Sequence, residues 1–272
     1  RAGRERLRRF LRGPGGEYDT LRDRPGAAAT SRLSVDLHFG TVSVRAAYRA
    51  GAAGLSARPA AQAAFLRQLV WREFALHLLH AHPTLLERPF RADWVGFPFR
   101  DDEAGYQAWA EGRTGYPIVD AAARQLLAEG YVENRARMVA ASFLVKDLLV
   151  DFRRGEAHYM ANLVDADWAS NDLGWQWVTG CGCDAQPWFR VFHPVLQGER
   201  FDPEGEYVRR HVPELCRMPS RYVHRPWEAP AAVLREAGVE LGRDYPRPIV
   251  DHREAAARFL SVARGHLGRD RP

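Results

Sequence analysis

YPIVDAAARQLL (116–127), ENRARMVAASFLVKDLL (133–149) and DADWASNDLGWQW (165–177) follow one another in the middle of the chain. Apolar residues recur in the first two segments at three- and four-residue steps, which is typical of helices with one buried face. The same segments carry paired acids, amides and indoles on a few turns. We interpret them as a helical scaffold that builds a pocket for a flat ligand with polar edges and negative charge.

A helical pattern also precedes this stretch. Three helices are expected, over 60–81, 120–129 and 133–152. The first ends before Pro83, the second closes at Gly130, and the third has Gly155 beyond its end.

Alternating patterns that would indicate strands are scarce, and loops are expected at 89–115 and 180–205. We therefore predict an all-α fold with one helical domain over 18–272. A basic lead-in, the remnant of a linker or helix, precedes it at 1–17.

Composition limits the class of protein. The chain has 272 residues, 46% of them hydrophobic and 27% charged, which is ordinary for a globular domain. It contains no apolar run long enough to span a membrane, and its basic start without an apolar region leads us to expect no secretory signal. Its three cysteines form neither a disulfide framework nor a metal-ligand set, so we expect reduced thiols, a cytoplasmic protein and no metal.

The net charge is positive. It amounts to 39 − 34 = +5, with an isoelectric point near 9.4, and Lys146 is the only lysine. Arginine pairs bidentately with phosphate, so a polyanionic partner is compatible with this composition. An ordinary solvated surface explains the charge equally well.

TSRLS, at Thr30–Ser34, gathers hydroxyls and an arginine at an expected helix start. Free amides and hydroxyls at such a place bind anions, although the motif alone also fits an ordinary helix cap.

Asn134 and Asn171 can donate and accept hydrogen bonds at the edge of a ring ligand. Asp165 and Asp167, two residues apart, fit an acid/base pair, a metal site or a solvated loop.

Taken together, these segments resemble the FAD-binding half of DNA photolyases and cryptochromes. The resemblance runs from about Tyr18 to Trp227, more loosely to the end, and covers only the C-terminal half of a typical family member. It implies a helical FAD-binding domain that lacks the N-terminal α/β antenna domain and its chromophore. The implied partner is UV-damaged DNA, and a monomer is expected.

The resemblance also implies which residues hold FAD. The counterpart of Asn171 sits against flavin N5 and helps hold the reduced anionic state, and the counterparts of Asp165 and Arg137 form an ion pair beside the ring. Tyr18 and the TSRLS motif grip the diphosphate, although Val35 and Asp36 depart from the family pattern. The full expected set is Tyr18, Thr30, Ser31, Arg32, Leu33, Ser34, Phe65, Gln68, Arg72, Asn134, Arg137, Asp165, Ala166, Asp167 and Asn171.

Family members flip a pyrimidine dimer out of the duplex and hold it against apolar and aromatic walls. The residues that match this lesion pocket are Trp71, Asn134, Arg135, Met138 and Trp177. The implied catalytic residues are Asn171, Trp175, Gln68 and Met138.

Gln68 departs from the family pattern, because cyclobutane-dimer enzymes commonly carry Glu there. Gln at this place also occurs in (6-4) photolyases and animal-type cryptochromes. The (6-4) enzymes use a His pair, however, and residues 133–137 offer no His.

A chain of three tryptophans carries electrons to the flavin in many family members. Trp175 matches the one nearest the flavin, but Phe152 and Phe99 stand at the other two positions. Phenylalanine is far harder to oxidise than indole, so weak photoreduction is expected unless Trp168, Trp177, Trp188 or Tyr159 provides a detour.

The function implied is light-driven repair of cyclobutane pyrimidine dimers by an electron from excited reduced FAD. The alternatives are a cryptochrome-like blue-light photoreceptor, repair of (6-4) lesions, and a fragment that cannot hold FAD.

Overall fold

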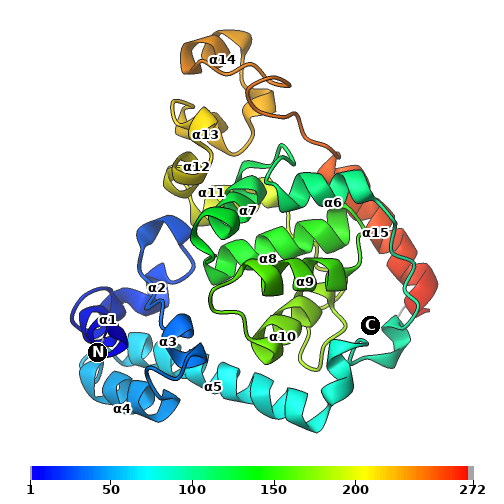
Figure 1. Ribbon diagram of the computed structural model, residues 1–272. Coiled ribbons are helices and arrows are strands. Elements are labelled where there is room, and N and C mark those ends of the chain that lie inside the picture. The colour runs from blue at the N-terminus through cyan, green and yellow to red at the C-terminus, as the bar shows by residue number, and fades with distance from the viewer. Residues whose placement is uncertain (1, 269–272) are drawn as a thin grey trace.

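Figure 1 shows the computed structural model, which describes residues 2–268 and consists of helices joined by loops. The α-helices are α1 (Ala2–Arg12), α2 (Tyr18–Leu21), α3 (Ser34–His38), α4 (Val44–Gly54), α5 (Pro59–Ala81), α6 (Glu103–Ala110), α7 (Pro117–Glu129), α8 (Asn134–Ser142), α9 (Phe152–Asn162), α10 (Trp168–Thr179), α11 (Pro194–Phe201), α12 (Glu206–His211), α13 (Ser220–Val223), α14 (Ala231–Ala237) and α15 (His252–Leu267). Within residues 2–268 the only strand-like feature is an isolated bridge between Leu241 and Tyr245. The all-α prediction is confirmed.

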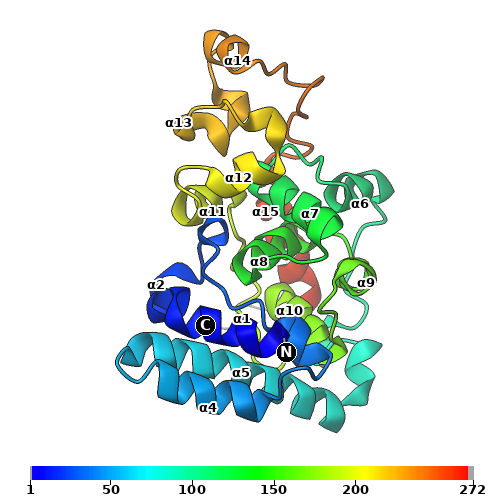
Figure 2. The same ribbon diagram turned by 60° about the vertical axis from the view of Figure 1, so that its left-hand side comes forward.

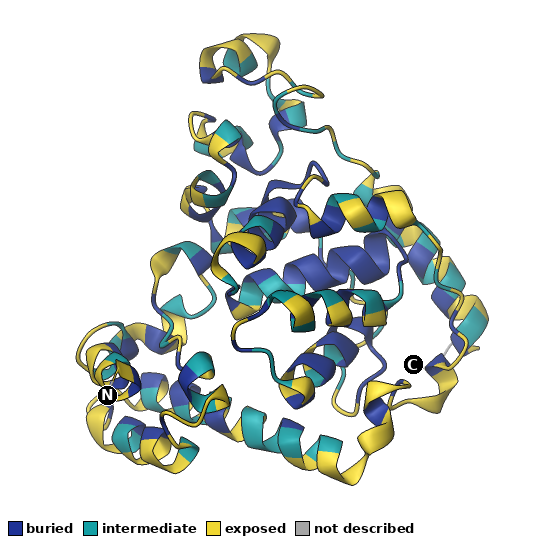
Figure 3. Cartoon of the chain, in the orientation of Figure 1, coloured by how far each residue is buried: buried dark blue, intermediate teal, exposed yellow. Residues whose placement is uncertain are grey.

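Helix α8 lies at the centre and packs on α7 and α10, while α9 packs on α10 and α7 (Figures 1 and 3). Its Val139, Ala140 and Ala141 are buried, and small side chains here let the neighbouring helices approach closely. Helix α15 closes the opposite side of this core with Phe259 and Ala263. The main hydrophobic core therefore surrounds the segments on which the sequence analysis is based.

A second, smaller core lies beneath the N-terminal helices. Helix α5 runs along the base of the molecule and packs on α2, α4 and α10 (Figure 2). Helix α1 adds Leu7 and Phe10 to this core, and the Phe10 ring lies 5.5 Å from Tyr18 and 5.1 Å from Phe65. Residues before Tyr18 thus form a packed helix, while the division of the chain at that residue stays a prediction.

Helix-end signals predicted two elements well. Helix α5 begins at Pro59 and ends at Ala81, before Pro83. Helix α7 ends at Glu129, and Gly130 adopts the left-handed conformation that commonly terminates a helix (φ 62°). Helix α7 begins at Pro117, three residues earlier than expected, because proline is well suited to a first helical turn.

The helix expected over 133–152 was right only as far as Asp147. Helix α8 ends at Ser142, a π-helical turn follows over Phe143–Asp147, and Leu149 takes a positive φ of 59° before α9 starts at Phe152. Gly155 therefore lies inside α9, where a Cβ would meet the Trp175 ring at 2.2 Å. The apolar stripe continues through the break, so periodicity alone does not reveal it.

The loops expected at 89–115 and 180–205 were also partly wrong. They contain a 3-10 turn at Ala92–Trp94 and the helices α6 and α11. Both helices have eight residues, too few for a clear periodic signal. None of the helices in residues 2–268 is both long and apolar enough to cross a membrane.

Candidate functional site

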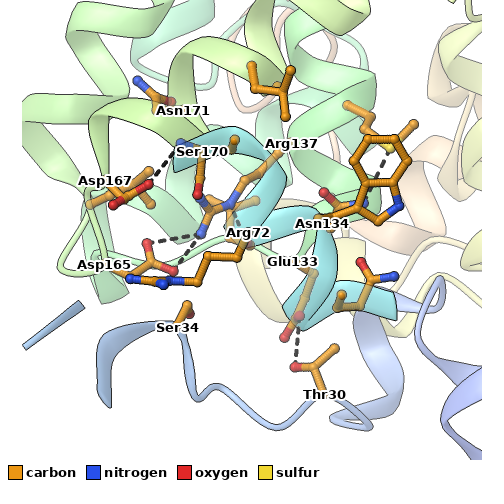
Figure 4. Close-up of a pocket in the computed structure, with 18 of the residues that line it drawn as sticks. Thr30, Ser34, Arg72, Glu133, Asn134, Arg137, Asp165, Asp167, Ser170 and Asn171 are labelled. Carbon is orange, nitrogen blue, oxygen red and sulfur yellow. Dashed lines mark hydrogen bonds and ion pairs between the residues drawn. The ribbon is translucent and has the colours of Figure 1, made fainter. Parts of the chain in front are cut away.

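A cavity of about 560 Å³ opens between α5, α8 and α10 and the segment before α3. This volume lies within the range of roughly 300–1,000 Å³ found for small-molecule sites. Figure 4 shows Thr30 and Ser34 on one side of the cavity and Asp165, Asp167, Arg137 and Asn171 on another. The expected site residues that line it are Tyr18, Thr30, Ser31, Arg32, Leu33, Ser34, Phe65, Gln68, Trp71, Arg72, Asn134, Arg137, Met138, Asp165, Asp167, Asn171, Trp175 and Trp177.

Two expected residues do not line the cavity. Arg135 points elsewhere, because it donates to Asp23 at 3.1 Å and its guanidinium stacks 4.3 Å from the centre of the Phe201 ring. Ala166 packs on the main core between the two aspartates. The structure therefore brings together all of the expected site residues except these two.

The hydroxyl-rich segment borders the cavity at the start of α3. Helix α3 begins at Ser34, and the Ser31 hydroxyl accepts a hydrogen bond from the Leu33 amide at 3.3 Å. The Arg32 guanidinium is already engaged, since it lies 2.8 Å from Glu129 and 4.4 Å from the centre of the Tyr131 ring. Arg32 thus ties this segment to α7, which leaves the hydroxyls as its polar contribution to the cavity.

Tyr131 and Glu133 also line the cavity, and the sequence analysis missed both. The Thr30 hydroxyl donates to Glu133 at 3.0 Å, and the Tyr131 hydroxyl donates to it at 3.2 Å. Burial raises the pKa of the Glu133 carboxyl. These contacts join the segment before α3 to the start of α8. The available signal was their position, directly before Asn134 in the decisive stretch.

An ion pair stands beside the cavity. Arg137 Nη2 lies 3.1 Å from both carboxylate oxygens of Asp165, and its Nε donates to the Val132 carbonyl at 2.7 Å. The Asp167 carboxylate accepts from the Ser170 amide at 2.8 Å and so caps α10. Two aspartates and one arginine thereby hold fixed positions at the polar edge of the cavity (Figure 4).

The side-chain amide of Asn171 is held by a hydrogen bond from its nitrogen atom. Its Nδ2 donates to the Glu156 carbonyl at 3.0 Å, and its Oδ1 has no hydrogen bond within residues 2–268. Behind it, burial raises the pKa of Glu156 to about 8, with a further rise from Asp172, and burial raises the pKa of Asp172 to about 6. Asn171 therefore presents an acceptor to the cavity with two buried acids behind it.

Comparison with known proteins decides the family. The family described as "FAD binding domain of DNA photolyase" matches residues 65–264. This chain belongs to that family.

Curated and solved members of the photolyase family agree with this assignment. The chain is 49% identical to a deoxyribodipyrimidine photo-lyase of Agrobacterium fabrum, over 95% of this chain and 54% of that protein. It is 42% identical to cryptochrome-1 of Arabidopsis thaliana, over 94% of this chain and 39% of that protein. A crystal structure of a class III photolyase from Agrobacterium tumefaciens superposes with a TM-score of 0.93 at 47% identity, covering 97% of this chain and 55% of that one. The chain spans about half the length of the photo-lyase that it matches.

The part of the photolyase-type cavity nearest the surface is aromatic. Trp71 is 39% exposed and packs edge-to-face on Phe74, with ring centres 5.5 Å apart. Asn134 Nδ2 donates to the Met138 sulfur at 3.4 Å, so that these two side chains form one unit. Gln68 is half-buried on α5, with one long hydrogen bond of 3.5 Å to the Ala64 carbonyl. These groups form an aromatic and amide-rich wall at this end of the cavity.

Trp175 borders the cavity from the core side and is only 3% exposed. Its ring contacts Tyr159 at 5.2 Å and Trp109 at 6.0 Å between centres. Phe152 and Phe99 lie 6.5 Å apart between ring centres. Of the four expected detour residues, Tyr159 and Trp177 line the cavity, whereas Trp168 is 55% exposed.

Proposed function

We propose that this chain is the catalytic part of a deoxyribodipyrimidine photo-lyase that uses FAD to repair cyclobutane pyrimidine dimers in DNA. One observation carries the proposal. A single cavity gathers anion-binding hydroxyls, an arginine–aspartate pair, the free acceptor of Asn171 and an aromatic wall. Membership of the FAD-binding family supports the cofactor, and the photo-lyase relatives support the class of reaction.

The donor set of the cavity fits FAD. Ser31, Ser34 and Arg72 would hold the diphosphate, because hydroxyls and guanidinium groups bind phosphate oxygens. Arg137 and Asp165 would border the polar edge of the isoalloxazine. The free oxygen of Asn171 would accept a hydrogen bond from an N–H group, which a reduced flavin carries at N5 and an oxidised one does not. This favours a reduced cofactor, and we propose that its active form is the anion.

The flipped dimer of two adjacent pyrimidines would enter at the aromatic wall. Trp71 and Trp177 offer ring faces for the flipped pyrimidines, and the Gln68 amide offers a donor to their carbonyl oxygens. Bound reduced FAD supplies one electron to the dimer on excitation by blue light, and the electron returns after the ring opens. The side chains of this chain then have two tasks, which are to hold the dimer against the cofactor and to exclude water.

The second candidate is a cryptochrome-like photoreceptor. Gln68 and the 42% identity to cryptochrome-1 of Arabidopsis thaliana favour it. The residues that would hold a dimer favour repair. Repair of (6-4) lesions is a third outcome, which the absence of a His from 133–137 disfavours.

The test is repair by the purified protein. It is loaded with FAD, reduced chemically, and illuminated with an oligonucleotide that carries either a cyclobutane dimer or a (6-4) lesion, while the absorbance of restored bases is followed. We expect light-dependent recovery with the cyclobutane dimer alone and none in the dark. Bound FAD without recovery of either lesion would favour the photoreceptor, and recovery of the (6-4) substrate alone would overturn the lesion assignment.

Gln68→Glu provides a matched variant for the lesion assignment. Because a carboxyl group can donate a proton to the dimer as well as bind it, we expect the variant to repair cyclobutane dimers faster than the parent. Equal or slower repair would mean that this position does not contact the dimer.

A further inference from the structure

In the relay that the family resemblance implies, Trp175 gives an electron to the flavin and must then be reduced again by a neighbouring ring. Trp175 is the buried tryptophan on the core side of the cavity, but the Phe152 and Phe99 rings stand on the path that the family resemblance implies. Benzene rings are far harder to oxidise than indole. The expectation of weak photoreduction considers that path and four detour residues, but none of them lies on α6.

A different set of oxidisable rings touches Trp175. Trp109 of α6 lies 6.0 Å away between ring centres in an edge-to-face contact, and it is only 1% exposed. Tyr106, one turn earlier on α6, lies 6.1 Å from Trp109 and is half-buried at the surface. The three rings therefore form an unbroken series of contacts from the cavity wall to the protein surface.

Two further contacts affect how these three rings are held and how easily they are oxidised. Trp109 Nε1 donates to the Ala140 carbonyl at 2.9 Å, which fixes its ring against α8. The Arg154 guanidinium lies 3.9 Å from the centre of the Tyr106 ring. A positive charge there disfavours a positively charged ring, so Tyr106 would lose its electron together with its hydroxyl proton.

Tyr159 also touches both tryptophans, stacked on Trp109 at 6.0 Å and 5.2 Å from Trp175. It is buried, and burial raises the pKa of its phenol. A phenol that cannot release its proton to solvent is a poor terminal donor. Tyr106 is the ring of this group at which the proton can reach water.

We propose that Trp175, Trp109 and Tyr106 form an electron relay that replaces the tryptophan path interrupted at Phe152 and Phe99. The proposal rests on the proposed binding of FAD. Trp175 gives one electron to the light-excited oxidised flavin, Trp109 refills Trp175, and Tyr106 refills Trp109 while its hydroxyl proton passes to water. A thiol in solution then returns one hydrogen atom to the tyrosyl radical, so that one thiol is oxidised by one electron for each electron stored.

The test measures photoreduction of the protein loaded with oxidised FAD, under blue light with dithiothreitol. We expect Trp109→Phe and Tyr106→Phe each to slow photoreduction at least tenfold, whereas Trp168→Phe, which alters an exposed indole in none of these ring contacts, keeps the parental rate. The triple variant Trp109→Phe/Phe152→Trp/Phe99→Trp should regain the rate by the other path. Tyr106→Phe keeps a half-buried ring in place, so its result holds even if Trp109→Phe folds poorly.

A radical signature provides a second readout. Electron paramagnetic resonance during illumination should show a tyrosyl signal in the parent and a tryptophanyl signal in Tyr106→Phe. Parental photoreduction rates in both single variants, or no photoreduction by a parent with flavin bound, would overturn the relay. Failure of the parent to bind FAD, or of its chemically reduced form to repair a dimer, would instead count against the proposed function.

Discussion

Arg137 and Asp165 face each other beside the cavity, with one guanidinium nitrogen 3.1 Å from each carboxylate oxygen. The Asp165 side chain is 4% exposed and that of Arg137 is 26% exposed. The carboxylate has therefore lost most of its water, and Arg137 is the cation that compensates it. In the proposed function such a pair would serve both folding and cofactor binding, and the two roles can be separated.

Removing one partner should cost more than removing both. Arg137→Ala leaves a buried carboxylate unpaired, so we expect the free energy of unfolding to fall by about 3–5 kcal/mol. The double variant Arg137→Met/Asp165→Leu replaces the pair by apolar groups and should recover most of that loss. Urea unfolding without FAD measures both, and neither variant should retain FAD.

The exposed pair between Arg113 and Glu111 provides the control. Arg113→Ala should change stability by about 0–1 kcal/mol and leave FAD binding intact. If Arg137→Met/Asp165→Leu were no more stable than Arg137→Ala, desolvation of the unpaired Asp165 carboxylate would not be the main cause of the lost stability.

Much of the helical fold could be predicted from the sequence. The physical reasons differ from one helix to the next. Helices α5 and α7 carry Pro and Gly at their ends, and these residues act through local geometry. The break after α8 carries no such signal, because Leu149 adopts a left-handed conformation usually left to Gly and tertiary packing holds it there. An apolar stripe cannot reveal a turn of this kind.

The candidate site, too, could be predicted only in part from the sequence. The resemblance to the photolyase family identified side chains that line one cavity. The spacing of these residues in the sequence could not have identified them. It did not predict that Arg135 contacts Asp23 and Phe201, because both partners are distant in sequence. Trp109 was missed because it lies on α6, within a segment expected to be a loop.

Trp71 provides a prediction for lesion binding. Stacking of a base on an aromatic side chain contributes about 1–3 kcal/mol, so Trp71→Ala should raise the Kd for dimer-containing DNA roughly 5- to 150-fold. FAD content should stay near the parental value, because the ring is 39% exposed. Fluorescence anisotropy with a labelled duplex measures the affinity.

Trp168→Ala is the matched control, since that indole is 55% exposed and does not line the cavity. It should bind damaged DNA like the parent. An equal loss of affinity in both variants would show that Trp71 contributes general surface contact and no lesion pocket.

Gly155 allows α9 and α10 to approach each other. A Cβ at this position would stand 2.2 Å from the Trp175 ring and 2.6 Å from Leu144, so one of them must move. We expect Gly155→Ala to lower the free energy of unfolding by about 1–3 kcal/mol, as overpacking of a core does. Thermal unfolding followed by circular dichroism measures the change.

Gly265→Ala is the comparison, because nothing lies within 4 Å of its Cβ position in α15. There alanine should stabilise the helix by about 0.5–1 kcal/mol. If Gly155→Ala also stabilised the protein, helix propensity would outweigh the contact with Trp175.

Glu156 should make stability depend on pH. Its pKa is raised by burial to about 8, with Asp172 adding to the rise, whereas a glutamate in the unfolded chain ionises near 4.5. Between these values the folded state binds one more proton than the unfolded state, so the free energy of unfolding falls as pH rises. The contribution is fully favourable below pH 4.5 and its loss is complete above pH 8.

Glu156→Gln should remove this slope. The pKa of Asp172 lies near 6, so the interval from pH 6 to pH 8 isolates Glu156 from it. There the parent should lose up to about 1.4 kcal/mol per pH unit more than the variant, in urea unfolding at several pH values. The variant keeps the backbone carbonyl that accepts from Asn171, so FAD content should be preserved. Glu254→Gln, at the exposed start of α15, should keep the parental slope. Parallel curves for the parent and Glu156→Gln would mean that the buried acid behind Asn171 is already ionised in the folded protein.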